Sequence, residues 1–309
     1  MFKVFIDGSA GTTGLKIKER LSRRDDISLI SIPEELRKDV EQRKQAINSA
    51  DVVFLCLPDA AAKEAVSLIE NPNVKVIDAS TAHRTNENWA YGFAELSGKR
   101  ELIKNSKKIA NPGCHASGFI ALVNPLIEAG LLDKNVFLTC FSITGYSGGG
   151  KSMIAEYEDE ERNFYLDSPR QYGLTQSHKH LPEMVALCGL ENTPIFCPIV
   201  SDFDRGMQVT VPLFKNQLNG SIENIKAVYK KLYNGKIVKY KDCADEAGFL
   251  ASNVMKGRDD MEISVFGNED RILLVARFDN LGKGASGAAI QNMNILLGVE
   301  ETKGLIIGE

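Results

Sequence analysis

Three glycines close to the start of the chain constrain the fold more than any other feature of this sequence. Residues 3–7 (KVFID) read as a short strand. The pattern G-x-x-G-x-x-G follows at Gly8, Gly11 and Gly14, and residues 12–24 then show the apolar spacing of an amphipathic helix with a basic end. A strand, a glycine-rich turn and a helix in this order predict an anion-binding turn, because a helix N-terminus favours negative charge.

The first third of the chain alternates apolar strands with helices. Strands are expected at residues 27–32, 51–58 and 74–80, with helices at 34–49 and 59–70. The run at 51–58 is apolar throughout, which is typical of a strand buried on both faces of a parallel sheet. This alternation predicts βαβ units in a doubly wound α/β sheet of the Rossmann type, which binds a dinucleotide at its glycine-rich turn.

The pattern changes after about residue 133. Longer strands and a single amphipathic helix replace the regular alternation, with strands expected at 135–144, 207–214 and 271–279 and the helix at 222–235. These elements predict an α+β layer. A last helix is expected at 284–298, with one side made of small residues that allow close packing.

Two domains are therefore expected. Residues 1–113 together with 286–309 are predicted to form the dinucleotide-binding domain, because the last helix can pack closely on the first sheet. Residues 114–285 are predicted to form an α+β domain for catalysis and oligomerisation.

Composition excludes several classes of protein. The 309 residues carry a net charge of −4 without a basic block, so nucleic acid is not an expected partner. No apolar run is long enough to cross a membrane, and the first residues do not read as a signal peptide. Six scattered cysteines without a C-x-x-C pair favour neither disulfides nor a zinc site, and they fit a reducing cytoplasm.

Cys114 is the candidate nucleophile. It follows Pro112 and Gly113, which end the preceding element, and it comes before an apolar run with helical spacing from Phe119 to Leu131. A cysteine in the first turn of a helix is favoured as a thiolate by the helix dipole. The alternative is an ordinary buried cysteine that packs as a small hydrophobic residue.

Two of the four histidines, His178 and His180, stand two residues apart, a spacing that gives side chains on the same side only in an extended segment. A histidine distant in sequence is the expected base for a cysteine nucleophile. The alternatives are a metal pair or a surface loop, but further ligands at local spacing are lacking, so no metal is expected. His83 and His115 are weaker candidates, since His115 follows Cys114 directly and is expected to point elsewhere.

Residues 144–151 (TGYSGGGK) contain three successive glycines before Lys151. Such a backbone either approaches a ligand closely and binds an anion through its N–H groups, or forms a flexible turn. In the first glycine-rich turn, Thr12 and Thr13 either donate to phosphate or cap the helix.

The choice of nicotinamide cofactor is open from spacing alone. Glu34 and Glu35 stand near the place where an acidic residue binds the ribose of NAD. Arg37 and Lys38 follow them and offer positive charge for the 2′-phosphate of NADP.

The chain resembles the N-acetyl-gamma-glutamyl-phosphate reductases of arginine biosynthesis, and more closely their shorter form. The resemblance covers nearly the whole chain and rests on seven stretches in order: DGSAGTTG, FLCLPDAAA, DASTAHR, NPGCHASG, TGYSGGGK, SHKHLPE and GASGAAIQNMN. One departure from the longer form is His-Ala-Ser after Cys114, where Tyr-Pro-Thr is common.

The resemblance implies an NADPH-dependent reduction of an acyl phosphate to an aldehyde through a thioester on Cys114, with His178 as acid/base. It implies substrate contacts at His180, Tyr172, Ser147 and Lys151. It implies NADP(H) contacts in the first turn, after the third strand and late in the chain, at Gly8, Ser9, Gly11, Thr12, Thr13, Gly14, Pro58, Asn280 and Gly284. The expected partners are a small acyl-phosphate substrate and further copies of the chain, as a dimer or tetramer.

Three alternatives stay open. Aspartate-semialdehyde dehydrogenase shares the fold and the mechanism, but the H-x-H-x-P-E pattern fits it poorly. A non-catalytic dinucleotide-binding sensor leaves Cys114 and the histidine pair unexplained. A cysteine hydrolase leaves the glycine-rich turn without a task.

Overall fold

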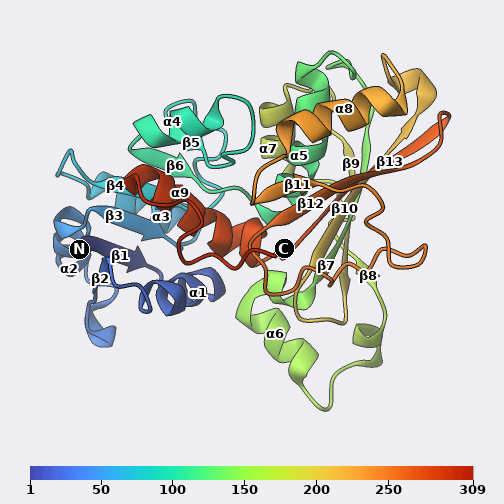
Figure 1. The fold of residues 1–309 in the computed structure, drawn as a ribbon. Coiled ribbons are helices and arrows are strands. Elements are labelled where there is room, and N and C mark those ends of the chain that lie inside the picture. Colours follow the sequence, from blue (N-terminus) through green and yellow to red (C-terminus); the bar gives the residue numbers. More distant parts are fainter. Residues whose placement is uncertain (309) are drawn as a thin grey trace. The chain divides into compact units, whose positions relative to one another are not determined.

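The computed structural model describes residues 1–308, and the chain divides there into two compact units (Figure 1). The first unit comprises residues 1–94, 98–112 and 285–305. The second unit comprises residues 95–97, 113–284 and the segment from Ile306 onward. Across the described part of the chain, every helix is too short or too polar to span a lipid bilayer.

The first unit contains a sheet of parallel strands in the order β2-β1-β3-β4-β6-β5. Its strands are β1 (Phe2–Asp7), β2 (Ile27–Ile30), β3 (Val52–Leu55), β4 (Lys75–Asp78), β5 (Ala90–Tyr91) and β6 (Lys108–Ala110). Every residue of β3 is buried, as expected for a strand covered on both faces. This arrangement confirms the predicted doubly wound, Rossmann-type architecture.

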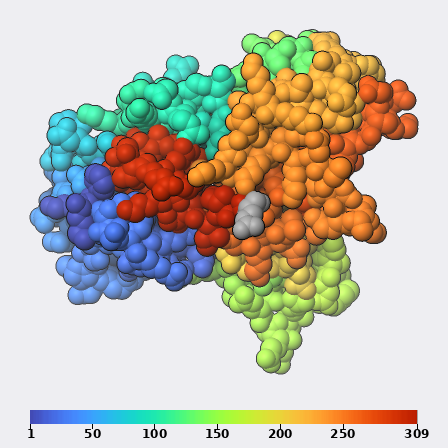
Figure 2. Space-filling view, viewed as in Figure 1, coloured from blue at the N-terminus to red at the C-terminus, as the bar shows by residue number. Residues whose placement is uncertain are grey.

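Helices cover both faces of this sheet. They are α1 (Thr12–Leu21), α2 (Val40–Ser49), α3 (Asp59–Ser67), α4 (Lys99–Asn105) and α9 (Gly287–Leu297). Val4 and Ile6 of β1 pack in one apolar cluster with residues of α1, α4 and α9, while Phe5 packs in a second cluster with residues of α2 and α3. Figure 2 shows α9 (red) beside the N-terminal elements (blue). The C-terminal helix therefore completes the core of the first unit.

The helix predicted at 34–49 is broken. The structure has a 3₁₀ turn at Glu34–Leu36, and α2 begins only at Val40. Asp39 causes the break, because it is extended and its carboxylate accepts the backbone N–H of Gln42 at 2.9 Å, which caps the new helix.

The second unit contains a mixed sheet in the order β11-β12-β13-β10-β7-β9-β8. Its strands are β7 (Thr139–Gly145), β8 (Arg170–Gln171), β9 (Ile195–Ser201), β10 (Met207–Phe214), β11 (Val238–Tyr240), β12 (Met261–Gly267) and β13 (Arg271–Phe278). β10 pairs antiparallel with both β13 and β7, whereas β7 and β9 are parallel. The predicted α+β layer is confirmed.

The helices of the second unit are α5 (Cys114–Glu128), α6 (Gly150–Glu158), α7 (Leu181–Cys188) and α8 (Ile222–Leu232). α5 packs on β10 and β13, with α7 and α8 as further neighbours. It lies close to the sheet at Gly118, where an added Cβ would lie 2.4 Å from Cγ2 of Val209. A glycine at this position lets the helix lie directly on the sheet.

Candidate active site

Cys114 is the first residue of α5 and is partly exposed. Gly113 before it is extended and provides no side-chain cap. The first N–H groups of the helix, which point toward its start, therefore receive no acceptor from the side chain of the N-cap residue. Gly284 also lies close by, since a Cβ added to it would lie 3.0 Å from Cβ of Cys114. Any larger residue at 284 would press on the thiol-bearing residue.

His178 and His180 lie together, although not in the predicted way. The expectation of an extended segment is wrong, because His180 has helical backbone angles and is the N-cap residue of α7. Its backbone N–H donates to Nδ1 of His178 at 3.2 Å, and the two ring centres are 4.8 Å apart at nearly right angles. This hydrogen bond forms a turn that brings the rings together edge to face.

His115 belongs to the same group, so the expectation that it points elsewhere is also wrong. Its ring centre lies 5.7 Å from that of His178 and 5.6 Å from that of His180. Nε2 of His115 is 2.7 Å from Oη of Tyr172, and Nδ1 is 2.7 Å from Oγ of Ser142. The side chain points toward β7 and β9, where Ser142 and Phe196 receive it.

Burial keeps the side chains of His178, His115 and Tyr172 neutral near pH 7. It lowers the pKa of His178 to about 4, with the charge of Lys179 adding to the effect. It lowers the pKa of His115 to about 3, with His178 and Lys179 as smaller causes. It raises the pKa of Tyr172 above its ordinary value, and Cys114 adds to the shift. Neutral His178 can therefore accept a proton, and the phenol of Tyr172 stays protonated.

Glu183 is a site residue that the sequence analysis missed. It is buried on α7, and its carboxylate accepts the backbone N–H of Gly113 at 3.2 Å. The only sequence signal is its place three residues after His180 in the H-x-H-x-P-E stretch. A glutamate in the first turn of a helix is common, which makes this signal inconspicuous.

A cavity of about 440 Å³ runs along α7 with His178 at its border. Its lining is Gln176, Ser177, His178, Leu181, Pro182, Val185, Ala186 and Thr193. Apart from His178, the predicted catalytic and substrate residues are not part of this lining.

The glycine-rich segment 144–151 is held by Asn280. The amide of Asn280 donates to Oγ of Ser147 at 3.1 Å, and its carbonyl oxygen accepts the N–H of Gly206 at 2.9 Å. Ser147 and Asn280 are both buried, whereas Lys151 is exposed in the first turn of α6. Asn280, predicted to contact the cofactor, thus has both ends of its amide engaged within the second unit.

The first unit has a cavity of about 360 Å³ beside the glycine-rich turn. Its lining is Phe5, Ile6, Asp7, Gly8, Ser9, Ala10, Gly11, Lys18, Leu29, Ile30, Ser31, Ile32, Glu34, Arg37, Lys38, Cys56, Leu57 and Pro58. Gly8 has a φ of 87°, and a Cβ there would lie 2.3 Å from the carbonyl oxygen of Cys56. A Cβ on Gly14 would lie 2.5 Å from the carbonyl oxygen of Gly8, so both glycines are needed for the turn.

The remaining predicted cofactor residues surround this turn. Gly11 is the N-cap residue of α1, so Thr12 and Thr13 occupy the first two helical positions and do not cap the helix. Pro58 is the N-cap residue of α3 and lines the cavity. Within residues 1–308, His, Cys, Asp and Glu side chains form no group of three or more that could hold a metal ion.

Family models match both units. A model of the semialdehyde dehydrogenase NAD binding domain matches residues 3–106, and a model of the semialdehyde dehydrogenase dimerisation domain matches residues 114–280. Together with the doubly wound sheet and the helix that starts at a cysteine, these matches define a two-domain enzyme of the semialdehyde dehydrogenase class.

Curated relatives narrow this class. N-acetyl-gamma-glutamyl-phosphate reductase 2 of Nostoc sp. is 46% identical over 98% of this chain and 99% of its own. N-acetyl-gamma-glutamyl-phosphate reductase of Brucella ovis is 47% identical over 96% and 99%, respectively. The chain belongs to the N-acetyl-gamma-glutamyl-phosphate reductase family.

Solved structures show the same fold. Aspartate semialdehyde dehydrogenase II of Vibrio cholerae, complexed with ASA, has a TM-score of 0.71 at 16% identity over 96% of this chain and 98% of its own. The aspartate semialdehyde dehydrogenase of Francisella tularensis has a TM-score of 0.70 at 16% identity, over 96% and 100%. At this identity the likeness concerns the fold alone.

Proposed function

We propose that this protein reduces N-acetyl-γ-glutamyl phosphate to N-acetylglutamate semialdehyde and phosphate, with NADPH as the reductant, as a step of arginine biosynthesis. The observation that carries the proposal is Cys114 at the start of α5, directly before His115, whose ring lies 5.7 Å from that of His178. Both imidazoles are neutral near pH 7, and the chain is 46–47% identical to reductases of that name. Because the six cysteines, all within the described residues, form no disulfide, we place the reaction in a reducing compartment, the cytoplasm.

Cys114 would act as the nucleophile. A carboxylate resists reduction, whereas an acyl phosphate carries a leaving group that a thiol can displace. His178 takes the proton of the Cys114 thiol, sulfur attacks the acyl carbon, and a thioester forms as the bond to phosphate breaks. His178 gives its proton to the departing phosphate oxygen, which leaves the imidazole neutral again.

The second half of the reaction regenerates the thiol. NADPH, when bound, supplies the hydride that the thioester carbonyl carbon accepts. Backbone N–H groups at the start of α5 can stabilise the resulting oxyanion, whose collapse releases the aldehyde and the Cys114 thiolate. Cys114 then regains a proton from water through His178, so that one proton is consumed per turnover.

The residues of the first unit fit an NADP-type cofactor. The positive φ at Gly8 and the absence of a Cβ at Gly14 form the phosphate-binding turn, and Ser9 and Pro58 line the cavity beside it. Arg37 and Lys38 line the same cavity after β2, where a 2′-phosphate would need positive charge. Arg37 forms an ion pair with Glu34, which is exposed.

Substrate binding needs local donors because the chain and the substrate are both negatively charged. We assign this role to His180 and Tyr172 in the histidine group, together with Ser147 and Lys151 of the glycine-rich segment. Tyr172 supports the assignment best, since its phenol is protonated and its ring lies 6.0 Å from that of His178.

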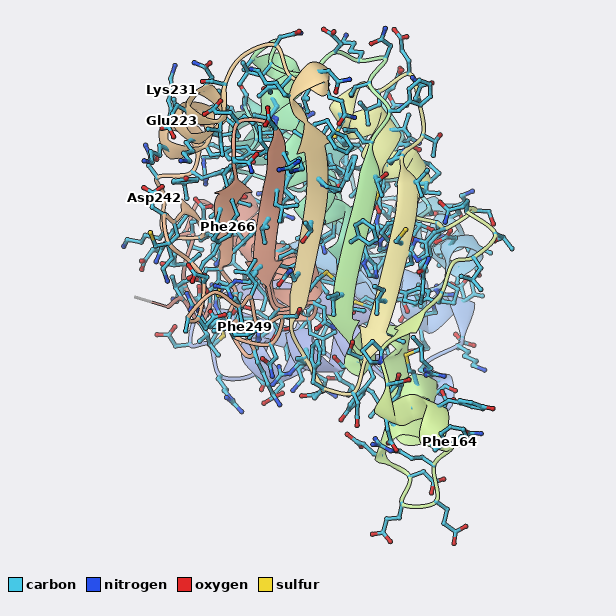
Figure 3. All side chains as sticks on the ribbon, turned by 90° about the vertical axis from the view of Figure 1, so that its right-hand side faces the viewer. Phe164, Glu223, Lys231, Asp242, Phe249 and Phe266 are labelled. Atoms are coloured by element: carbon cyan, nitrogen blue, oxygen red, sulfur yellow. The ribbon has the colours of Figure 1, made fainter. Side chains whose placement is uncertain are left out.

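The apolar face of the second sheet is the proposed contact between copies. α5 packs on one face of β10 and β13, and no helix is drawn in front of the opposite face in Figure 3. That face presents Phe141, Leu273 and Ile195, which are 43%, 40% and 58% exposed. A second copy of this chain would bury these side chains, in line with the dimerisation domain that matches this unit.

The reverse reaction tests the proposed function. Purified protein with N-acetylglutamate semialdehyde, phosphate and NADP⁺ should form NADPH, and aspartate semialdehyde should be a poor substitute. Cys114→Ser should lose activity by several orders of magnitude and keep its affinity for NADPH, since serine has no accessible anion near neutral pH. Faster turnover of aspartate semialdehyde would assign the alternative substrate, and an active serine variant would refute the thioester.

A further inference from the structure

His115 is a buried side chain held at both ends inside the candidate active site. It is the second residue of α5. Its ring nitrogens each meet a hydroxyl group at 2.7 Å, Ser142 Oγ at Nδ1 and Tyr172 Oη at Nε2. Ser142 is itself buried on β7. These contacts fix the plane of the imidazole and the position of the Tyr172 oxygen.

The protons of this chain of three groups have two arrangements, because a neutral imidazole donates at one nitrogen and accepts at the other. In the first, Ser142 donates to Nδ1, and the Nε2–H of His115 donates to the oxygen of Tyr172. The phenol proton is then available to a third group. In the second, the phenol donates to Nε2 and has no proton left for a ligand.

The surroundings favour the first arrangement once an anion is bound. The hydroxyl of Tyr172 lies 2.7 Å from Nε2 of His115, the residue directly after Cys114, which places the phenol close to the start of α5. Its pKa is raised by burial, with the charge of Cys114 adding to the effect. A negatively charged oxygen attached to the carbon that Cys114 attacks needs a donor, and only the first arrangement provides the phenol proton.

We propose that His115 is a positioning residue: together with Ser142 it holds the phenol of Tyr172 so that its O–H donates to a negatively charged oxygen of the substrate bound at Cys114. This inference rests on the proposed function, since it requires an acyl phosphate or the oxyanion derived from it. His115 itself acts through Tyr172, because both of its nitrogens are engaged with protein hydroxyls.

Two amide variants separate the two ends of the imidazole. The amide of glutamine reaches the place of Nε2, and that of asparagine reaches the place of Nδ1, so only His115→Gln keeps a partner for Tyr172. We expect His115→Asn to lower kcat about 100-fold, the effect of a misplaced group in an active site, and His115→Gln to restore most of the loss.

A double variant tests whether His115 works through Tyr172. Tyr172→Phe should show a similar loss of kcat, and His115→Asn combined with Tyr172→Phe should be no slower than either single variant. Tyr233→Phe is the matched control, because Tyr233 is another buried tyrosine whose hydroxyl donates to α5, at the carbonyl oxygen of Ala121 at 2.7 Å. We expect its kcat to equal that of the wild type.

Several results would overturn the inference. The first two are an unchanged kcat in His115→Asn and an additive loss of kcat in the double variant. The third is slower alkylation of Cys114 by iodoacetamide in His115→Asn, because this result would show that His115 acts on the thiol. If thermal unfolding shows that His115→Asn does not fold, Ser142→Ala replaces it, and its loss of kcat should disappear in the Tyr172→Phe background. Failure of the proposed function is distinct, because the wild type then shows no turnover.

Discussion

The buried carboxylate of Glu183 on α7 accepts the backbone N–H of Gly113, the residue directly before Cys114, at 3.2 Å. The contact joins two helices at the point where α5 begins. Glu183 therefore fixes the start of α5, the helix that begins with Cys114.

Removal of this carboxylate should destabilise the fold. Glu183→Ala leaves the Gly113 N–H without this acceptor and should lower the free energy of unfolding by about 1–3 kcal/mol. Glu183→Gln keeps an acceptor oxygen and should lose clearly less. Urea denaturation followed by circular dichroism measures both changes, and equal stability of all three proteins would contradict the assigned contact.

The two histidines of the pair should affect different kinetic constants. His178→Asn removes the proposed acid/base, so it should mainly lower kcat, by about 100- to 10,000-fold. His180→Asn removes a proposed substrate contact and should mainly raise KM. Steady-state rates with N-acetylglutamate semialdehyde decide between them. An interchange of the two effects would interchange the two roles.

Stability should fall as the pH decreases below about 6.5. Burial lowers the pKa of His178 to about 4 and that of His115 to about 3, whereas histidine in an unfolded chain titrates near 6.5. Between these values the unfolded state binds more protons, so the free energy of unfolding rises with pH and reaches its full value above about 6.5.

The titration can be followed by urea unfolding between about pH 7 and pH 5. The titratable groups around the rings of His178 and His115 are His180, Tyr172 and the charged Lys179. His178→Asn should make the dependence on pH shallower. The same slope in the variant and the wild type would show that His178 titrates alike in both states.

Cofactor choice should depend on the basic residues after β2. Arg37→Ala and Lys38→Ala should each weaken binding of 2′,5′-ADP about 10-fold or more, since a charge-assisted contact with phosphate is lost, and leave 5′-ADP unaffected. Titration calorimetry measures this without turnover. Arg23→Ala is the control, because Arg23 is exposed near the end of α1 and is not part of the cavity lining. Equal weakening for both nucleotides would place the 2′-phosphate elsewhere.

The exposed face of the second sheet should control assembly. Leu273→Lys places a charge where a second copy would pack, so the mass measured by light scattering should fall to that of one chain. Leu102→Lys is the matched control, since Leu102 is 48% exposed on α4 of the first unit. Assembly that survives Leu273→Lys would exclude this face as the contact.

Local patterns made much of the fold predictable. The strand, the three glycines and α1 follow one another within twenty-one residues, and β10 occupies the predicted range 207–214. β12 was not identified, although Met261, Ile263 and Val265 alternate with Glu262 and Ser264 in the period-two pattern of a strand. The break before α2 depends on a single capping residue, Asp39, within a charged stretch that otherwise reads as continuous helix.

Less of the candidate site than of the fold could be predicted from the sequence. Cys114 could be found because Pro112 and Gly113 mark the start of a helix. The direction of His115 could not, since it depends on Ser142 of β7 and on Tyr172 directly after β8, both distant in sequence. Glu183 was missed for the same reason, because its partner Gly113 is 70 residues away.

Gly118 determines how close α5, and with it Cys114, lies to the second sheet. It stands one helical turn after Cys114, and an added Cβ here would lie 2.4 Å from Val209 and 3.0 Å from Phe278. Because α5 lies this close to the sheet, we expect it to keep its position relative to the sheet. A change of substrate length within this scaffold then has to be accommodated by the loops around Cys114. We therefore expect Cys114 to keep its position in this scaffold, and the loop residues around it to determine which substrate is accepted.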